Sequence, residues 1–240
     1  FLMPVHENND CIEDTINNVI KFNPDIEPLF ALHVNKGFND FDEQRFTRPN
    51  LVFMYCQDNM TGVKFESQLS PLMRLYKLAK DRFGPDFEYV KIFHTSELFV
   101  RYGFYDYIKN FDTAFDPRTD GLPERYNPIF SMQLFNNITD KIYYHGVELS
   151  FYKKIVFDKV EYAAHHLPVS CEKLNEFFNY TPIEEVVIPT LAMYYSEKVG
   201  RNTLLFVDDL TNITLEPCQF SVKSVPRDIN HPLRVKVREL

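Results

Sequence analysis

The sequence predicts a single α/β domain with an open, mostly parallel sheet flanked by helices. Three observations predict this class. Apolar runs of strand length alternate with amphipathic helical stretches over the first hundred residues. One run, Leu29–Val34, is apolar almost throughout, as in strands buried on both faces of a parallel sheet. The length of 240 residues suits one large domain or two small ones, and we expect one.

The first forty residues predict a strand, a helix and a second strand. Phe1–Val5 is the first strand, and Asp10 is the candidate N-cap of a helix whose apolar residues recur at helical spacing. Asn23-Pro24 ends that helix, and Leu29–Val34 is the second strand. A unit of this kind favours a right-handed crossover.

The alternation continues along the next fifty residues. Asn50–Tyr55 is a third strand, Ser67–Phe83 an amphipathic helix, and Glu88–Thr95 a fourth strand. Ligands on such sheets bind at the carboxyl ends of the strands, so the residues that follow each strand are the first candidates for a site.

The pattern becomes less regular after Phe99. Asp112–Asn127 is expected to be a polar loop, either on the surface or at the mouth of a ligand site. Thr181 is the natural N-cap of a late helix. The remaining expected elements are a strand over Tyr143–Phe151, helices over Lys154–His165 and Pro182–Tyr195, short strands over Leu204–Val207 and Cys218–Val222, and a basic helix over Arg234–Leu240.

Composition excludes several classes of function. The net charge of -8 argues against a general nucleic-acid binder, and no apolar run approaches the ~20 residues of a membrane span.

The cysteines form no C-x-x-C pair, so we expect buried free thiols rather than zinc, with disulfides as the alternative in an exported chain. The chain opens without Met, so we expect a trimmed or processed piece. Hydrolase, P-loop and dinucleotide motifs are absent.

Polar side chains cluster at the end of the second strand. His33, Asn35 and Lys36 stand where side chains of a parallel strand point into a crevice. There His33 can stack on a base, and Asn35 can hydrogen-bond a ribose or uracil edge. A capped strand end with a solvated lysine is the alternative.

Ser96 and Glu97 follow the fourth strand. Nucleotide-sugar enzymes often carry a metal-binding Asp-x-Asp there, and this chain has none. A hard cation needs several oxygen ligands, so we expect no tight metal site. Asp40 and Asp42 match the Asp-x-Asp pattern, but they lie in a loop two strands before the usual position. Asp208–Asp209 is a similarly weak candidate for a metal site.

Two later groups have chemistry suited to group transfer. Glu184 and Glu185 fall in the first turn of a predicted helix, where carboxylates ordinarily complement the dipole; the functional alternative is a general base for an acceptor hydroxyl. Lys223 lies on a short strand, and Arg227 follows a proline. Two cations on a stiff turn can neutralise a diphosphate leaving group, while a solvated basic tail is the alternative.

The order of these segments resembles the core-2/I-branching family of glycosyltransferases, which includes peptide O-xylosyltransferases. FLMPVHENND, a helix and LFALHVNK are similar to the opening of that family, in which a strand ends in a histidine, here His6. The family then has a His-Val-Asp-x-Lys motif. Here it is His33-Val34-Asn35-Lys36, with Asn35 in place of Asp and Lys36 one position early.

Four later segments continue the resemblance. FHTSELFVRYG lies where the family has Ser-Gly-x-Asp-(Phe/Tyr)-Pro and lacks the Asp. GVELSF is similar to Gly-x-x-Trp-x-x-Leu, with Glu148 near the missing Trp. TPIEEVVIPT looks like the family's Pro-x-Glu or Pro-Asp-Glu helix start with a Thr five residues after the Glu. Counting back from Thr190 selects Glu185, which we prefer, and counting from Pro182 selects Glu184. FSVKSVPRD resembles Phe-Ala-Arg-Lys, with Lys223 matching the Lys and Arg227 substituting for the Arg.

The resemblance implies a GT-A type fold, a nucleotide-sugar donor that is usually a UDP-sugar, inversion at the anomeric carbon and no metal or other cofactor. We therefore expect a metal-independent transferase with a glycan or protein acceptor. Residues 1–110 would form the nucleotide-binding half and residues 111–240 the acceptor and catalytic half. The alternatives are a metal-dependent GT-A transferase using an Asp pair and a non-catalytic sugar- or protein-binding module.

The expected site has three parts. Glu185, or Glu184, takes the proton from the acceptor hydroxyl, and Glu148 contacts the acceptor. The donor-binding residues are His6, His33, Asn35, Lys36, Ser96, Glu97, Lys223 and Arg227. The sequence leaves the compartment open: the Golgi lumen or secretory pathway for a eukaryotic chain, the cytoplasm for a bacterial or viral one.

Overall fold

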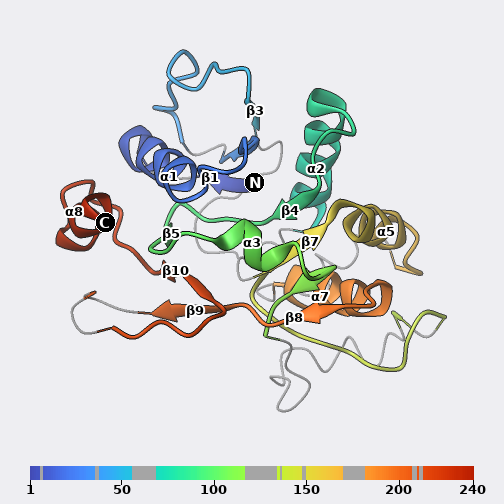
Figure 1. The fold of residues 1–240 in the computed structure, drawn as a ribbon. Helices are drawn as coiled ribbons and strands as arrows, with labels where there is room; N and C mark the ends of the chain where they lie inside the picture. The colour runs from blue at the N-terminus through green and yellow to red at the C-terminus, as the bar shows by residue number, and fades with distance from the viewer. Residues whose placement is uncertain are drawn as a thin grey trace.

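The computed structural model describes residues 1–5, 8–35, 38–55, 69–116, 134–135, 137–147, 150–169, 182–206, 210 and 213–240 (Figure 1). Its strands are β1 (Leu2–Val5), β2 (Phe30–Val34), β3 (Leu51–Tyr55), β4 (Tyr89–Lys91), β5 (Leu98–Phe99), β6 (Thr113–Ala114), β7 (Phe151–Lys153), β8 (Val199–Gly200), β9 (Thr203–Phe206) and β10 (Gln219–Lys223). Its helices are α1 (Asn9–Phe22), α2 (Leu69–Phe83), α3 (Phe104–Ile108), α5 (Lys154–His165), α7 (Glu184–Tyr195) and α8 (Pro232–Glu239).

The central strands run in the order β3-β2-β1-β4-β7-β6-β8. β1, β2 and β3 are parallel, and a parallel bridge from Leu2 to Ile92 joins β1 to β4. β7 is antiparallel to both β4 and β6, and β8 is parallel to β6. β1, β2, β3, β4 and β6 therefore point the same way, and their carboxyl ends lie along one edge, as the sequence predicts for an open, mostly parallel sheet.

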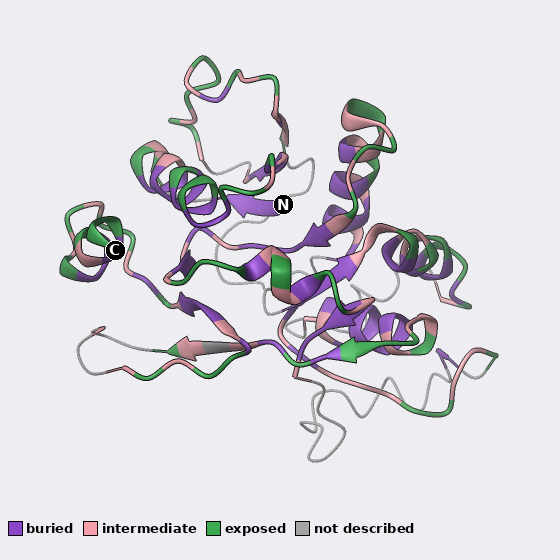
Figure 2. Cartoon of the chain, viewed as in Figure 1, coloured by how far each residue is buried: buried purple, intermediate pink, exposed green. Residues whose placement is uncertain are grey.

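Each face of this sheet has its own hydrophobic core, because successive side chains of a strand point to opposite faces. Ala31 of β2 belongs to the core that α2, α5 and α7 cover. Its neighbours Phe30 and Leu32 belong to the core that α1 and α8 cover. Figure 2 shows the buried stripes of α1 and α2 turned toward the sheet. β2 is buried along its whole length, as its continuous apolar run predicts.

A second, smaller sheet joins the middle of the chain to its C-terminal part. β10 pairs antiparallel with β5 and parallel with β9, which places the C-terminal segment beside the turn after β4. Leu233 and Val237 of α8 then pack in the same core as α1. Both halves of the chain thus contribute to this core.

The start of the first helix differs from the prediction. Asn8, not Asp10, is the N-cap, because its side chain accepts a hydrogen bond from the backbone nitrogen of Cys11 at 2.8 Å. The first three strands and the helix over Lys154–His165 are confirmed. Cys11 and Cys218 are buried and outside any disulfide, as expected; Cys56 and Cys171 lie outside the described residues.

The expected strand over Tyr143–Phe151 is wrong. β7 begins only at Phe151, because the preceding backbone bonds to α7: the nitrogen of Tyr143 donates to Thr190 Oγ1 at 3.0 Å, and that of His145 to the Glu185 carbonyl at 2.8 Å.

The later elements bring further corrections. α7 begins at Glu184 rather than Pro182, and α8 begins at Pro232 rather than Arg234. The fourth strand is shorter than Glu88–Thr95, because the chain turns before Glu97. The short elements β5, β6, β8 and α3 were not predicted, and β6 interrupts the expected loop. Thr181 and residues 117–127 lie outside the described part of the chain. In that part, no helix is long and apolar enough to cross a bilayer.

Candidate functional site

The candidate site lies where the carboxyl ends of the parallel strands meet. The residues expected there fall into a β4 side, a β2 side and a β6 side. Of the predicted site residues, His6, Lys36, Glu148 and the pair Asp208–Asp209 lie outside the described residues.

On the β4 side, Glu97 is anchored from within the protein. It is fully buried, and its Oε1 lies 3.0 Å from Lys91 Nζ and accepts a hydrogen bond from Ser221 Oγ at 2.6 Å. Burial raises the pKa of Glu97 and lowers that of Lys91, and their mutual attraction opposes both changes. Because Glu97 has no exposed surface, it lies beneath the candidate site rather than lining it.

Ser96 directly precedes Glu97 in the chain, and Lys223 lies close enough to the ion pair for both of its charges to affect the lysine pKa. The backbone nitrogen of Val225 donates to the Ser96 carbonyl at 3.0 Å, so the turn after β4 and the turn after β10 touch. Ser224 has a φ of 64°, an uncommon left-handed conformation for a residue with a side chain. Burial lowers the pKa of Lys223, the Glu97 carboxylate opposes this change, and Lys91 adds to it.

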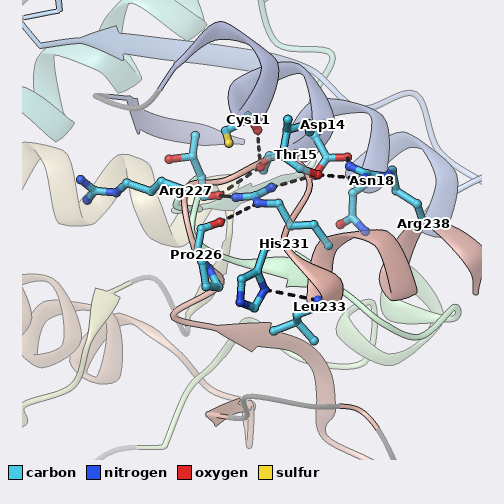
Figure 3. A network of polar contacts seen from close by, with 12 residues as sticks. Cys11, Asp14, Thr15, Asn18, Pro226, Arg227, His231, Leu233 and Arg238 are labelled. Atoms are coloured by element: carbon cyan, nitrogen blue, oxygen red, sulfur yellow. Dashed lines mark hydrogen bonds and ion pairs between the residues drawn. The ribbon is translucent and has the colours of Figure 1, made fainter.

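Arg227 is a second cation on the same turn. Its carbonyl accepts a hydrogen bond from Asn8 Nδ2 at 3.2 Å, and Asn8 also caps α1. The turn therefore lies at the amino end of a 14-residue helix, whose dipole favours negative charge there. Figure 3 shows the exposed Arg227 side chain extending away from Asp14 and Arg238. The structure thus places the turn that carries Lys223 and Arg227 against the turn that carries Ser96.

The β2 side supplies one residue near the edge. The nitrogen of Asn35 donates to the Val5 carbonyl at 3.0 Å, which places Asn35 beside the end of β1. His33 is buried within β2, with Pro4 and Met54 as its register partners, so it lies below the edge.

On the β6 side, the first turn of α7 reaches the same edge. His145, which donates to the Glu185 carbonyl, has its ring 5.6 Å from that of Phe115, and Phe115 directly follows β6. Strands β4 and β6 are separated by β7, so the two sides lie about 10 Å apart at the usual strand spacing. Glu185 is half-buried and Glu184 is buried, which leaves Glu185 better able to meet a substrate.

Asp40 and Asp42, which match the Asp-x-Asp pattern, make local hydrogen bonds. The Asp42 carboxylate accepts hydrogen bonds from the backbone nitrogens of Gln44 and Arg45 at 3.1 and 3.3 Å and so closes a local turn. The Asp40 carbonyl accepts from Asn9 Nδ2 at 2.7 Å. Across the described ranges, no three His, Cys, Asp or Glu side chains gather in a way that could hold a metal ion.

A cavity of about 530 Å³ opens at the other end of the strands. Leu2, Leu29 and Tyr89, near the amino ends of β1, β2 and β4, contribute to its lining. In open α/β sheets ligands bind at the carboxyl ends, so this cavity is not part of the candidate site.

Sequence reasoning missed the residues that hold the site from below. Lys91 and Ser221 contact Glu97, and Arg234, expected in an exposed basic tail, is fully buried. The one available signal was Lys91 itself, a lone charge within an apolar strand.

No known sequence family and no curated protein matches this chain. Among solved structures, it is similar to the galactosyltransferase LgtC in complex with donor and acceptor sugar analogues, with a TM-score of 0.50 and 11% identity over 99% of this chain and 93% of that one. An active-site mutant of LgtC gives a TM-score of 0.48 at 12% identity over the same shares. The apo bifunctional glycosyltransferase WbbM gives 0.44 at 8% identity, over 99% of this chain and 51% of that one. At these identities the likeness shows the fold, and the chain has the α/β fold of GT-A type that the sequence predicts.

Proposed function

We propose that this protein is an inverting, metal-independent glycosyltransferase of the core-2/I-branching kind, which moves a sugar from a UDP-sugar to a hydroxyl group of a glycan or protein. The observation that carries the proposal is the cationic turn of Lys223 and Arg227. It touches the Ser96 turn after β4 and lies at the amino end of α1. A diphosphate is the ligand that such a group of positive charges suits best.

The chemistry divides between the two sides of the site. The bond between the anomeric carbon and the diphosphate oxygen breaks, and Lys223, Arg227 and the α1 amino end stabilise the charge that develops on UDP. The acceptor oxygen forms the new bond from the opposite face of the sugar, which inverts the anomeric carbon. Glu185 takes the proton that the acceptor hydroxyl loses.

The separation of these groups supports a single displacement. Glu185 belongs to the β6 side and the cationic turn to the β4 side, and β7 lies between the strands β4 and β6, which are therefore about 10 Å apart. A sugar ring between them would have the base on one face and the leaving group on the other. Lys223 and Arg227 supply the positive charge that a divalent cation provides in other transferases.

The test is thermal unfolding with UDP and a panel of nucleotide sugars, each with and without EDTA. A ligand at 100 times its dissociation constant adds about 2.7 kcal/mol of stability. We expect a UDP-dependent shift that survives EDTA and is lost in Lys223→Met. Lys77→Met, which removes a lysine from the exposed face of α2, is the matched control and should keep the shift.

The other outcomes select the alternatives. A shift abolished by EDTA favours a metal-dependent transferase that uses an Asp pair. No shift with any nucleotide favours a non-catalytic module of the same fold. A UDP shift without turnover of any UDP-sugar would contradict the proposed activity but keep the donor site.

A further inference from the structure

The C-terminal helix sends one arginine beneath the candidate site. Arg234 of α8 is fully buried, and each of its guanidinium nitrogens donates a hydrogen bond. Nε donates to the Pro226 carbonyl at 2.8 Å, Nη1 to Asp14 Oδ2 at 2.7 Å and Nη2 to the Thr95 carbonyl at 2.8 Å. These acceptors belong to three separate segments: the turn after β10, helix α1 and the turn after β4.

Each acceptor lies next to a part of the proposed diphosphate site. Thr95 directly precedes Ser96, and Pro226 directly precedes Arg227. The third segment, α1, is capped by Asn8, whose side chain holds the Arg227 carbonyl. One guanidinium group therefore links the turn after β4, the turn after β10 and helix α1.

Stability alone does not account for a charged group in this position. Burying an ion pair costs desolvation energy, and well-packed apolar side chains are often as stable or more stable in its place. A guanidinium differs from an apolar side chain in being a flat fork with donors in fixed directions. It can hold two backbone carbonyls and one carboxylate in a single fixed geometry.

We propose that Arg234 is a positioning residue, which holds the turn after β4 and the turn after β10 in register so that Ser96, Lys223 and Arg227 meet one diphosphate. Helix α8 is then part of the construction of the donor site although it contacts no donor. This inference rests on the proposed function and extends it to residues that lie below the site.

Arg238 provides a matched comparison within the same helix. Its Nη1 lies 3.0 Å from Asp14 Oδ1, and its Nη2 donates to the Ile229 carbonyl at 2.8 Å. It shares the carboxylate with Arg234, but on the connection from β10 to α8 it bonds Ile229, beyond residues 223–227, rather than Pro226.

The experiment compares Arg234→Met, Arg234→Lys and Arg238→Met in the full chain. UDP affinity is measured by calorimetry, and amide hydrogen exchange is followed over residues 94–97 and 223–227. Arg234→Met should fold, because Arg238 still pairs with Asp14 and Lys91 still holds Glu97. We expect a loss of UDP affinity of about tenfold to a hundredfold, the scale of small misplacements of binding groups. Exchange should rise at both turns.

Arg234→Lys separates positioning from stability. Lysine keeps the positive charge beside Asp14, so the thermal stability should recover, but one ammonium group cannot reproduce the fork, so the UDP affinity should stay low. Arg238→Met should bind UDP like the unaltered protein and show unchanged exchange at both turns. Should Arg234→Met fail to fold, Arg234→Lys alone decides the question.

Full UDP affinity in folded Arg234→Lys would overturn the inference. Unchanged amide hydrogen exchange at the two turns in the Arg234 variants would also overturn it. The proposed function has its own point of failure, since it requires UDP binding by the unaltered chain. If that binding is absent while exchange still rises in the Arg234 variants, the function is contradicted and the role of Arg234 in holding the two turns is supported.

Discussion

The two sides of the candidate site are held by different kinds of contact. On the β4 side, Lys91 and Arg234 are buried cations: Lys91 pairs with the nearby Glu97, and Arg234 pairs with Asp14 from the other end of the chain. On the β6 side, neutral hydrogen bonds hold the first half of α7: the Glu185 carbonyl accepts from His145, and Thr190 Oγ1 bonds both backbone groups of Tyr143.

This difference matches the chemistry proposed for each side. A diphosphate carries its charge throughout the reaction, so the groups that bind it gain from a rigid arrangement set in advance. A general base needs mainly to reach one proton and to have a suitable pKa. The comparison therefore predicts that changes on the β6 side alter the rate, whereas changes on the β4 side alter folding and binding.

The largest effect is expected on the β6 side. Glu185→Gln keeps the size and hydrogen-bonding capacity of the side chain but removes the base, so kcat should fall by about 10²–10⁴-fold while UDP affinity is retained. Steady-state kinetics and calorimetry measure the two quantities. Glu184→Gln is the matched control and should keep most of the rate. More than about a tenth of the rate in Glu185→Gln would mean that another group is the base.

The second effect concerns folding and contrasts the two sides directly. Lys91→Met leaves the Glu97 carboxylate buried without its cation, which costs about 3–5 kcal/mol of unfolding free energy. Thr190→Val, the comparison on the β6 side, removes a neutral hydroxyl group and costs about 1–3 kcal/mol. Urea unfolding measures both.

A double variant shows whether the pair itself is needed for stability. Lys91→Met/Glu97→Leu should recover most of the lost stability, because no charge is left buried. If the double variant is less stable than Lys91→Met, Glu97 has a stabilising role of its own and the contrast between the two sides is weaker than we infer.

The sequence was informative where structure depends on neighbours along the chain. The first strands and helices follow from apolar runs and helical spacing. Ser96, Lys223 and Arg227 were chosen as candidates because they stand at or just beyond strand ends, and their role stays a prediction. Elements of two residues, such as β5 and β6, carry no pattern of their own; they exist because β10 and β7 pair with them.

The contacts beneath the site could not be read in the same way. Ser221 and Glu97 are 124 positions apart, and Asp14 and Arg234 are 220 apart. No spacing rule connects such pairs. A basic residue that looks like part of a solvated helix is, in the folded chain, the fully buried Arg234.

The smallest expected effect is a pH dependence of UDP binding on the β4 side. Burial lowers the pKa of Lys223 from the ordinary lysine value of 10.5. Only the protonated amine neutralises a diphosphate, so affinity should be full while Lys223 is charged and should fall as the pH rises through its lowered pKa. Calorimetry at several alkaline values, all below 10.5, measures this fall. Lys223→Arg is the matched variant, since arginine stays charged, and its affinity should be flat over the same range. An equal decline in both proteins would assign the titration to another group and remove Lys223 from the diphosphate site.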